Sequence, residues 1–397
     1  MHIPDGYLSP STCAVLYAGS APFWYVALRR LQRWLSTRLI PLLSVFAAFS
    51  FLVMMFNLPL PGGTTGHAVG VSIAAIILGP WASILAVSIA LLIQALFFGD
   101  GGITTLGANC FNMAIVGSLV GYFAYRLLAG RAAITAPRRV VAAGLAGYIA
   151  INASALCAAL ELGIQPLLFR DASGAPLYAP YPLRVALPAM LIGHLTFAGL
   201  AESVLSGGVL AYLQRANPSL LELTAPSAAR GDEGRRQVSI QGAWSTLRPL
   251  WIALALLLAL TPLGVLAGGA AWGEWGVRDF SQAAARQKIA AASSHVAPPS
   301  RAPQGLERLY SVWTAPFPQY APSFVRQPAL GHLLSAMFGS GIIILVFLIV
   351  SELWARGALG APSTRGSKVC KVLARRIASR QSPPGPRDSK RWPSPAQ

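Results

Sequence analysis

Long apolar segments separated by short polar loops run along most of the chain. A bilayer core is about 30 Å thick, so a crossing helix needs roughly 20 mostly apolar residues, and lipid leaves its backbone amides only internal partners. The pattern predicts an all-α integral membrane protein with seven helices in its first part and two in its second. The expected spans are residues 12–28, 39–58, 67–79, 81–98, 108–125, 140–162, 185–213, 250–267 and 330–354.

The segment 67–98 is too long for one upright span and short for two. The positions of the arginines in the loops indicate whether it crosses the membrane once or twice. Two crossings, with a turn at Gly79-Pro80, leave the loops around 61–66 and 100–107 without Lys or Arg. All loops on the other side then hold arginines, namely Arg29, Arg30, Arg33, Arg38, Arg126, Arg131, Arg138, Arg139, Arg215, Arg230, Arg235, Arg236 and Arg248. Because cytoplasmic loops are enriched in Lys and Arg, we expect a multi-pass cell-membrane protein with an external N-terminus and a cytoplasmic C-terminus.

The composition agrees with this class. Only 11% of the 397 residues are charged and 54% are hydrophobic, which excludes an ordinary soluble domain. The net charge of +18 follows from the positions of the loops and of a basic tail, and the tail lacks interleaved aromatic residues. No nucleic-acid partner is therefore expected. The four cysteines show no C-x-x-C spacing and indicate neither a disulfide framework nor a thiolate metal site.

Four segments are expected along the chain. Residues 1–215 form the membrane domain, and the polar residues 216–248 form a cytoplasmic linker. Residues 249–356 form a two-span part, with an external segment, 268–329, between its spans. Residues 357–397 are rich in Pro, Ser and Arg and are expected to be a disordered cytoplasmic tail.

The first two residues of the chain carry three nitrogens that can chelate a metal ion. A histidine at position 2 brings together the α-amine of Met1, the deprotonated His2 amide and the His2 imidazole in two fused rings. This nearly planar set suits Ni(II) or Cu(II) and leaves one position for a neutral imidazole. His67 is a candidate, because it follows a glycine-rich loop on the same side of the membrane. The alternative is a solvated His2 and a His67 that simply lies at the interface.

Other polar residues are candidates for supporting this site or for a different one. Those expected near the ligands are Asp5, Thr65, Asp100, Asn109 and Asn112; the alternative for the last three is an exposed turn followed by a helix start. His194 and Glu202 are eight residues apart in one span, about 12 Å along a helix and too far to chelate one ion together. We expect them to be hydrogen-bonded within the bundle. A membrane metalloenzyme built on them is disfavoured because there is no H-E-x-x-H pair.

Three motifs carry a resemblance to a known family: the segment Met1-His2-Ile3-Pro4-Asp5-Gly6, the pair Gly66-His67, and residues 94–102 continuing to 107–113. Over residues 1–215 they resemble the CbiM/NikM substrate-binding components of energy-coupling-factor cobalt and nickel importers. The resemblance implies a square-planar site made by Met1, His2 and His67. The second part, with Trp272-Gly273-Glu274-Trp275-Gly276, is similar to the small CbiN/NikN-like subunits, which implies a role in loading the metal.

The chain has no G-x-x-x-x-G-K-[ST] phosphate loop, so it is expected to be a transport component and not an ATPase. The resemblance implies a CbiQ/NikQ-like transmembrane coupling protein and a CbiO/NikO-like cytoplasmic ATPase as partners, with Ni²⁺ or Co²⁺ as substrate and no cofactor. Ligand preference does not separate the two metals, although four planar nitrogens favour Ni(II). A vitamin-binding component of the same transporter type is the alternative, and it has no need of a free N-terminus.

Overall fold

The computed structural model describes residues 1–34, 39–60, 63–218, 220–221 and 240–360. Residues Met1–Ile349 form one compact unit, and the residues from Val350 belong to a second one. The regular elements of the described chain are helices, apart from one short hairpin, β1 (Leu58–Leu60) with β2 (Thr64–Gly66). The helices of the first part are α1 (Pro10–Trp34), α2 (Leu39–Met54), α3 (Val71–Leu78), α4 (Pro80–Ile93), α5 (Leu106–Asn109), α6 (Gly117–Ala129), α7 (Pro137–Leu168), α8 (Leu183–Gly193) and α9 (Gly199–Ala216).

Three π-helical segments interrupt this series. They are η1 (Gln94–Phe98) after α4, η2 (Cys110–Val116) between α5 and α6, and η3 (His194–Ala198) between α8 and α9. Such segments are frequent at functional sites, because the widened turn redirects the side chains that follow. Two of them bear on the site described below, since η1 begins with Gln94 and η2 directly follows Asn109.

Among the described residues, six helical segments are long and apolar enough to cross a membrane, fewer than the nine expected spans. They are Pro80–Phe98, Leu106–Ala129, Pro137–Leu168, Leu183–Ala216, Leu247–Leu266 and Pro328–Val350. The expected span 67–79 is only the eight-residue helix α3, which starts after His67. Gly70 adopts a left-handed φ of 69° against the ring of Phe49, so the helix cannot continue back to His67.

Helix α7 packs against α6, α8 and α9. Small residues allow the close approach, since a Cβ on Gly147 would meet the Glu202 carbonyl oxygen of α9 at 2.9 Å. The opposite face of α7 is an exposed apolar stripe at helical spacing that suits contact with lipid: Val141, Leu145, Ile149, Leu156 and Leu160. The chain is therefore a helical, multi-pass membrane protein.

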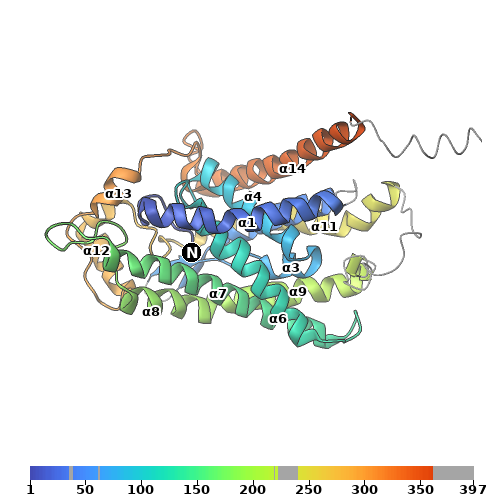
Figure 1. Cartoon of the computed structure of the whole chain (residues 1–397), viewed down its shortest axis with the longest axis horizontal. Helices are drawn as coiled ribbons and strands as arrows, with labels where there is room; N and C mark the ends of the chain where they lie inside the picture. Colours follow the sequence, from blue (N-terminus) through green and yellow to red (C-terminus); the bar gives the residue numbers. More distant parts are fainter. Residues whose placement is uncertain (35–38, 61–62, 219, 222–239, 361–397) are drawn as a thin grey trace, which may run out of the picture. The chain divides into compact units, whose positions relative to one another are not determined.

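The second part contributes α11 (Ile240–Leu260), the 3₁₀ segment η5 (Thr261–Leu266) and α14 (Pro328–Gly360). Between them lie α12 (Ala283–Ala292), α13 (Gln304–Leu309) and two 3₁₀ turns, η6 (Val277–Phe280) and η7 (Pro318–Tyr320). This connection contacts the N-terminal segment, since Tyr7 donates a hydrogen bond to Trp275 O at 2.8 Å. Figure 1 draws the N-terminus between α1 and α7, with α12 and α13 to its left. Backbone bonds join the two parts, from Gly305 N to Leu177 O at 2.7 Å and from Phe317 N to Phe97 O at 2.9 Å. The expected linker 216–248 and tail 357–397 lie largely outside the described residues.

Candidate metal centre

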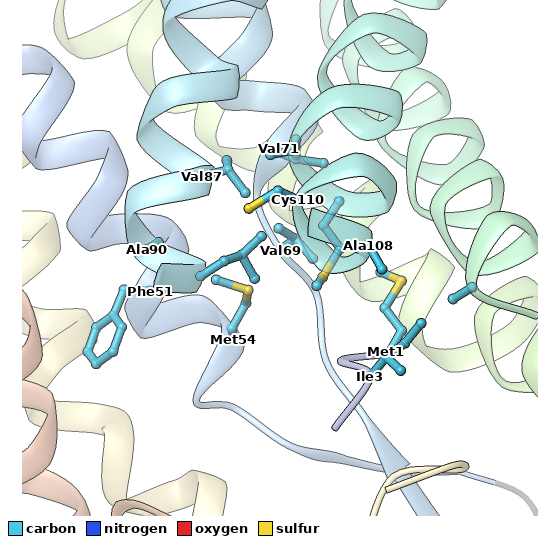
Figure 2. Close-up of a cluster of buried hydrophobic side chains, with 14 of the residues drawn as sticks. Met1, Ile3, Phe51, Met54, Val69, Val71, Val87, Ala90, Ala108 and Cys110 are labelled. Atoms are coloured by element: carbon cyan, nitrogen blue, oxygen red, sulfur yellow. The ribbon is translucent and has the colours of Figure 1, made fainter. Parts of the chain in front are cut away.

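The first residues of the chain are buried inside the helical bundle. Met1, His2 and Ile3 are only 3%, 3% and 1% exposed. Figure 2 shows Met1 and Ile3 in the same apolar cluster as Val69, Ala108 and Cys110. A buried terminus needs partners for its polar groups, because each unpaired one costs about 1–3 kcal/mol.

Asn109, at the end of α5, supplies two of these partners. Its Oδ1 accepts a hydrogen bond from Ile3 N at 2.8 Å, and its Nδ2 donates to Ile3 O at 3.1 Å. The Ile3 carbonyl also accepts from Gly102 N at 3.0 Å and from the Thr105 hydroxyl. The amide of Asn109 thus holds the main chain beside His2 in one place.

Asp5 holds the same region from the other side. Its carboxylate accepts bonds from Thr104 N at 2.7 Å, from Ile103 N at 3.1 Å and from the Thr104 hydroxyl. The loop of residues 102–104 is therefore fastened to the N-terminal segment. A Cβ on Gly102 would lie 2.4 Å from Asp5 N, so only glycine permits this approach.

His67 presents an imidazole that is ready to bind a metal ion. Its ring stacks on that of His2, with centroids 4.9 Å apart and planes at 29°. His67 Nδ1 lies 3.0 Å from the Ala68 carbonyl oxygen, which can only accept, so Nδ1 carries the proton and Nε2 has the lone pair. That Nε2 is buried and has no hydrogen-bond partner among the described residues. A neutral imidazole fixed through its other nitrogen is the usual form of a histidine ligand.

Two carboxylates face the nitrogens of the expected chelate. The amine of Met1 lies 3.5 Å from Glu274 Oε1, and His2 Nδ1 contacts Asp100 Oδ1. The fused chelate rings require Nδ1, because Nε2 is too far from the His2 amide to close a six-membered ring. A metal ion bound there must therefore displace Asp100 from His2 Nδ1, whereas a coordinated Met1 amine keeps two N–H groups that can still donate to Glu274.

Asp100 is itself held by Gln94 and Tyr320. Tyr320 donates to Asp100 Oδ2 at 2.6 Å, and Gln94 Nε2 lies 3.3 Å from the same oxygen. Gln94 Nε2 also donates to the Tyr320 hydroxyl at 2.8 Å. Tyr320 belongs to the second part of the chain, so both parts contribute to the polar shell around His2.

Burial and these charges shift the pKa values of the groups outside the candidate spans. Burial lowers the pKa of His67 well below 6.5, and the positive N-terminus lowers it further. Burial raises the pKa of Glu274, against the opposing effect of the N-terminal amine. Burial alone would raise the pKa of Asp100, but the charge of His2 and its hydrogen bond bring it below its usual range. The site thus combines a neutral His67 with a negative Asp100.

Most of the expected site residues meet at this point. Met1, His2 and His67 lie together, with Asp5, Asp100 and Asn109 around the N-terminal segment. Thr65 instead joins the two parts of the chain, through bonds of 3.3 Å to the carbonyl oxygens of Ala270 and Gly269. Asn112 lies elsewhere, donating to Glu161 Oε2 at 2.8 Å.

Sequence reasoning missed Glu274, Gln94 and Tyr320 as site residues. The signal for Glu274 was a single acidic residue between two tryptophans, whereas nothing in the sequence pointed to Tyr320. The described residues contain no group of three His, Cys, Asp or Glu side chains that could hold a metal. This is consistent with a site in which two of the four nitrogens come from the main chain.

Comparison with known proteins identifies the family. Residues 2–220 match the model of the CbiM family, the cobalt uptake substrate-specific transmembrane region. The chain belongs to this family. CbiM proteins are nickel or cobalt uptake transmembrane components, so the chain is a member of a transport family and not of an enzyme family.

Relatives of this family resemble the chain over different lengths. A fused nickel transport protein NikMN of Rhodobacter capsulatus is 55% identical, over 87% of this chain and 95% of the relative. A cobalt transport protein CbiM of Geobacter sulfurreducens is 34% identical, over 66% of this chain and 72% of the relative. A crystal structure of a transition metal transporter has a TM-score of 0.53 and 47% identity, covering 58% of this chain and all of that one. The CbiM-like region thus has a solved counterpart, and the fused relative extends across the second part.

Proposed function

We propose that this chain is the metal-capture subunit of an ATP-driven Ni(II) or Co(II) importer. The Met1 amine, the His2 amide and Nδ1, and His67 Nε2 form a square-planar nitrogen site that takes the ion from outside. The observation that carries this proposal is the buried, unpartnered Nε2 of His67 against the ring of His2, beside a buried N-terminal amine. A neutral imidazole nitrogen that is buried among apolar groups without a hydrogen-bond partner is stabilised when it coordinates a metal ion.

The metal adds a double positive charge, and the amine and the His2 amide each give up one proton when they bind it. Net charge therefore changes little when the ion enters, which suits a site in an apolar environment. Glu274 lies against the amine, and Asp100 lies against His2 Nδ1, whose proton must also move away before that nitrogen can bind the ion. Four planar nitrogens favour Ni(II) over Co(II).

The remaining features of the proposal follow from the topology. A seven-helix bundle of residues 1–215 holds the site, and the two further spans carry the external connection that covers it. The N-terminus lies outside the cell membrane and the C-terminus in the cytoplasm, since the arginine-rich connection between α6 and α7 lies at the end of the helices away from the N-terminus in Figure 1. A transmembrane coupling protein and a cytoplasmic ATPase on separate chains supply the energy.

The test measures metal binding to the purified full-length chain by absorption spectroscopy and native mass spectrometry. We expect one Ni(II) or Co(II) in the parent chain, and none at the same metal concentration after one residue is added before Met1 or after His67→Ala. The matched control is His295→Asn, because His295 is an exposed histidine of the external connection. Undiminished binding in both altered chains would overturn the site. Loss of a bound organic ligand instead of a metal would favour the vitamin-binding alternative.

A further inference from the structure

A small cavity adjoins the candidate metal centre on the side of α8. Its lining includes Met1, the hairpin residues Thr64 and Thr65, Trp272 of the second part, Met190 of α8 and His194 of η3. Met1 therefore belongs both to the proposed nitrogen site and to this cavity.

His194 has the same unused nitrogen as His67. Its Nδ1 lies 2.7 Å from the Met190 carbonyl oxygen, so Nδ1 carries the proton and Nε2 has a lone pair. His194 is 3% exposed, and its Nε2 has no hydrogen-bond partner among the described residues. An imidazole used only for structure would leave this buried acceptor unpaired at a cost of about 1–3 kcal/mol, whereas a metal ion would use it.

The surroundings of His194 also suit a transition metal. Met190, one turn before His194, and Met1 both line the cavity, and both side chains carry a thioether. Imidazole binds Ni(II) and Co(II), while thioethers are softer and bind these ions weakly, so the cavity would hold an ion less tightly than four nitrogens do. The π-helical turn that begins at His194 is a further sign of a functional position.

The cavity lies near the C-terminal end of α8, whereas the residues just before the start of α8 contact the N-terminal segment of the chain. Helix α8 begins at Leu183, close to Ala179, whose amide bonds to Tyr7 O. His194 is eleven residues farther on, about 16 Å along the helix axis. Because Met1 and His194 line the same cavity, His194 Nε2 is the nearest candidate ligand that this cavity offers to an ion released from the nitrogen site.

We propose that His194 Nε2, with the thioether of Met190, forms a second and weaker metal site that receives the ion when it leaves Met1, His2 and His67. The proposal rests on the proposed function, since it takes the first site as the source of the ion. When the ion leaves the first site, the Met1 amine and the His2 amide each take back the proton that they released on binding it. His194 Nε2 and the Met190 thioether bind the ion through lone pairs and release no proton.

The binding test uses the full-length chain with His2→Ala and His67→Ala, which removes the first site and keeps Met1 in place. With excess Ni(II) and native mass spectrometry, we expect one weakly bound ion in this background. The additional change His194→Gln should abolish it, and Met190→Leu should weaken it several-fold. The matched control is His332→Gln, because His332 is also buried in a helix of the apolar region but its Nε2 lies 3.2 Å from Met55 O. The proposal is overturned if the background chain binds no ion, or if its ion is still bound after the additional change His194→Gln.

A second measurement separates a transfer site from a structural histidine. His194→Gln in the otherwise unaltered chain should bind Ni(II) at the first site with unchanged affinity and unfold at an unchanged temperature. Nickel accumulation by cells that carry the complete importer should fall by about tenfold or more. Equal losses of first-site affinity and thermal stability would show a structural role and overturn the proposal. If the unaltered chain binds no Ni(II), the proposed function itself fails, which is a distinguishable result.

Discussion

The imidazole rings of His2 and His67 stack with their centroids 4.9 Å apart, although α1 and α2 lie between them in the sequence. Stacked rings do not direct their nitrogens at one point, as a planar metal site requires. The His2 ring must therefore turn away from Asp100 when its Nδ1 becomes a ligand. Asp100 keeps Tyr320 and Gln94 as partners when this happens, so its charge is not left alone.

Asn109 and Asn112 lie one helical turn apart and provide a matched pair. Asn109→Ala removes both side-chain bonds to Ile3 and frees the main chain beside His2, so we expect Ni(II) affinity to fall by about 10- to 100-fold. Asn112→Ala removes only the partner of Glu161 and should leave affinity unchanged while lowering the unfolding temperature. Isothermal titration and thermal unfolding of both variants measure this. Equal affinities in the two variants would contradict the anchoring role of Asn109.

Gly102 fixes the distance between Asp5 and its loop. In Gly102→Ala the new Cβ would lie 2.4 Å from both Asp5 N and Asp5 Oδ1, so the N-terminal segment must shift. We expect at least about tenfold weaker Ni(II) binding, since ligand position depends on such supporting contacts. The control is Gly208→Ala on α9, where a Cβ meets nothing within 4 Å. Normal binding by Gly102→Ala would show that the segment tolerates this displacement.

Glu202 accepts hydrogen bonds from Val69 N at 2.8 Å and Gly70 N at 2.9 Å, two and three residues after His67. Glu202→Ala leaves both buried amides unpaired, and each costs about 1–3 kcal/mol, so we expect a clear fall in unfolding temperature and weaker Ni(II) binding. Glu202→Gln keeps an acceptor oxygen, so its unfolding temperature and its Ni(II) affinity should fall less than those of Glu202→Ala. The exposed Glu307 provides the control Glu307→Ala. The expectation fails if alanine and glutamine at position 202 give the same result.

Metal affinity should increase with pH. The amine and the His2 amide release protons when they bind the ion, so a rise in pH drives binding. His67 contributes no proton near neutrality, because burial keeps its pKa well below 6.5 and it is already neutral. His67→Ala should therefore weaken binding without changing the slope of log Kd against pH between about pH 6 and pH 8. A slope that decreases by one proton in this variant would show that His67 is protonated in the metal-free chain.

The sequence by itself determined the membrane class, the position of the long apolar helices and the family. These follow from local properties: the length of an apolar run, the side on which arginines occur, and short motifs read in order. The assignment of Met1, His2 and His67 also came from local chelate chemistry, and their role as ligands stays a prediction.

Tertiary structure alone decided where α3 begins and which acidic groups face the site. The ring of Phe49 and the left-handed Gly70 start that helix after His67, and Glu274 reaches the Met1 amine from the far second part of the chain. Asn109 and Asn112 look alike in the sequence, yet only the first faces the N-terminus, because the helical turn between them points their side chains at different neighbours. Apolar length is a property of consecutive residues, whereas the partner of a buried charge depends on packing between distant ones.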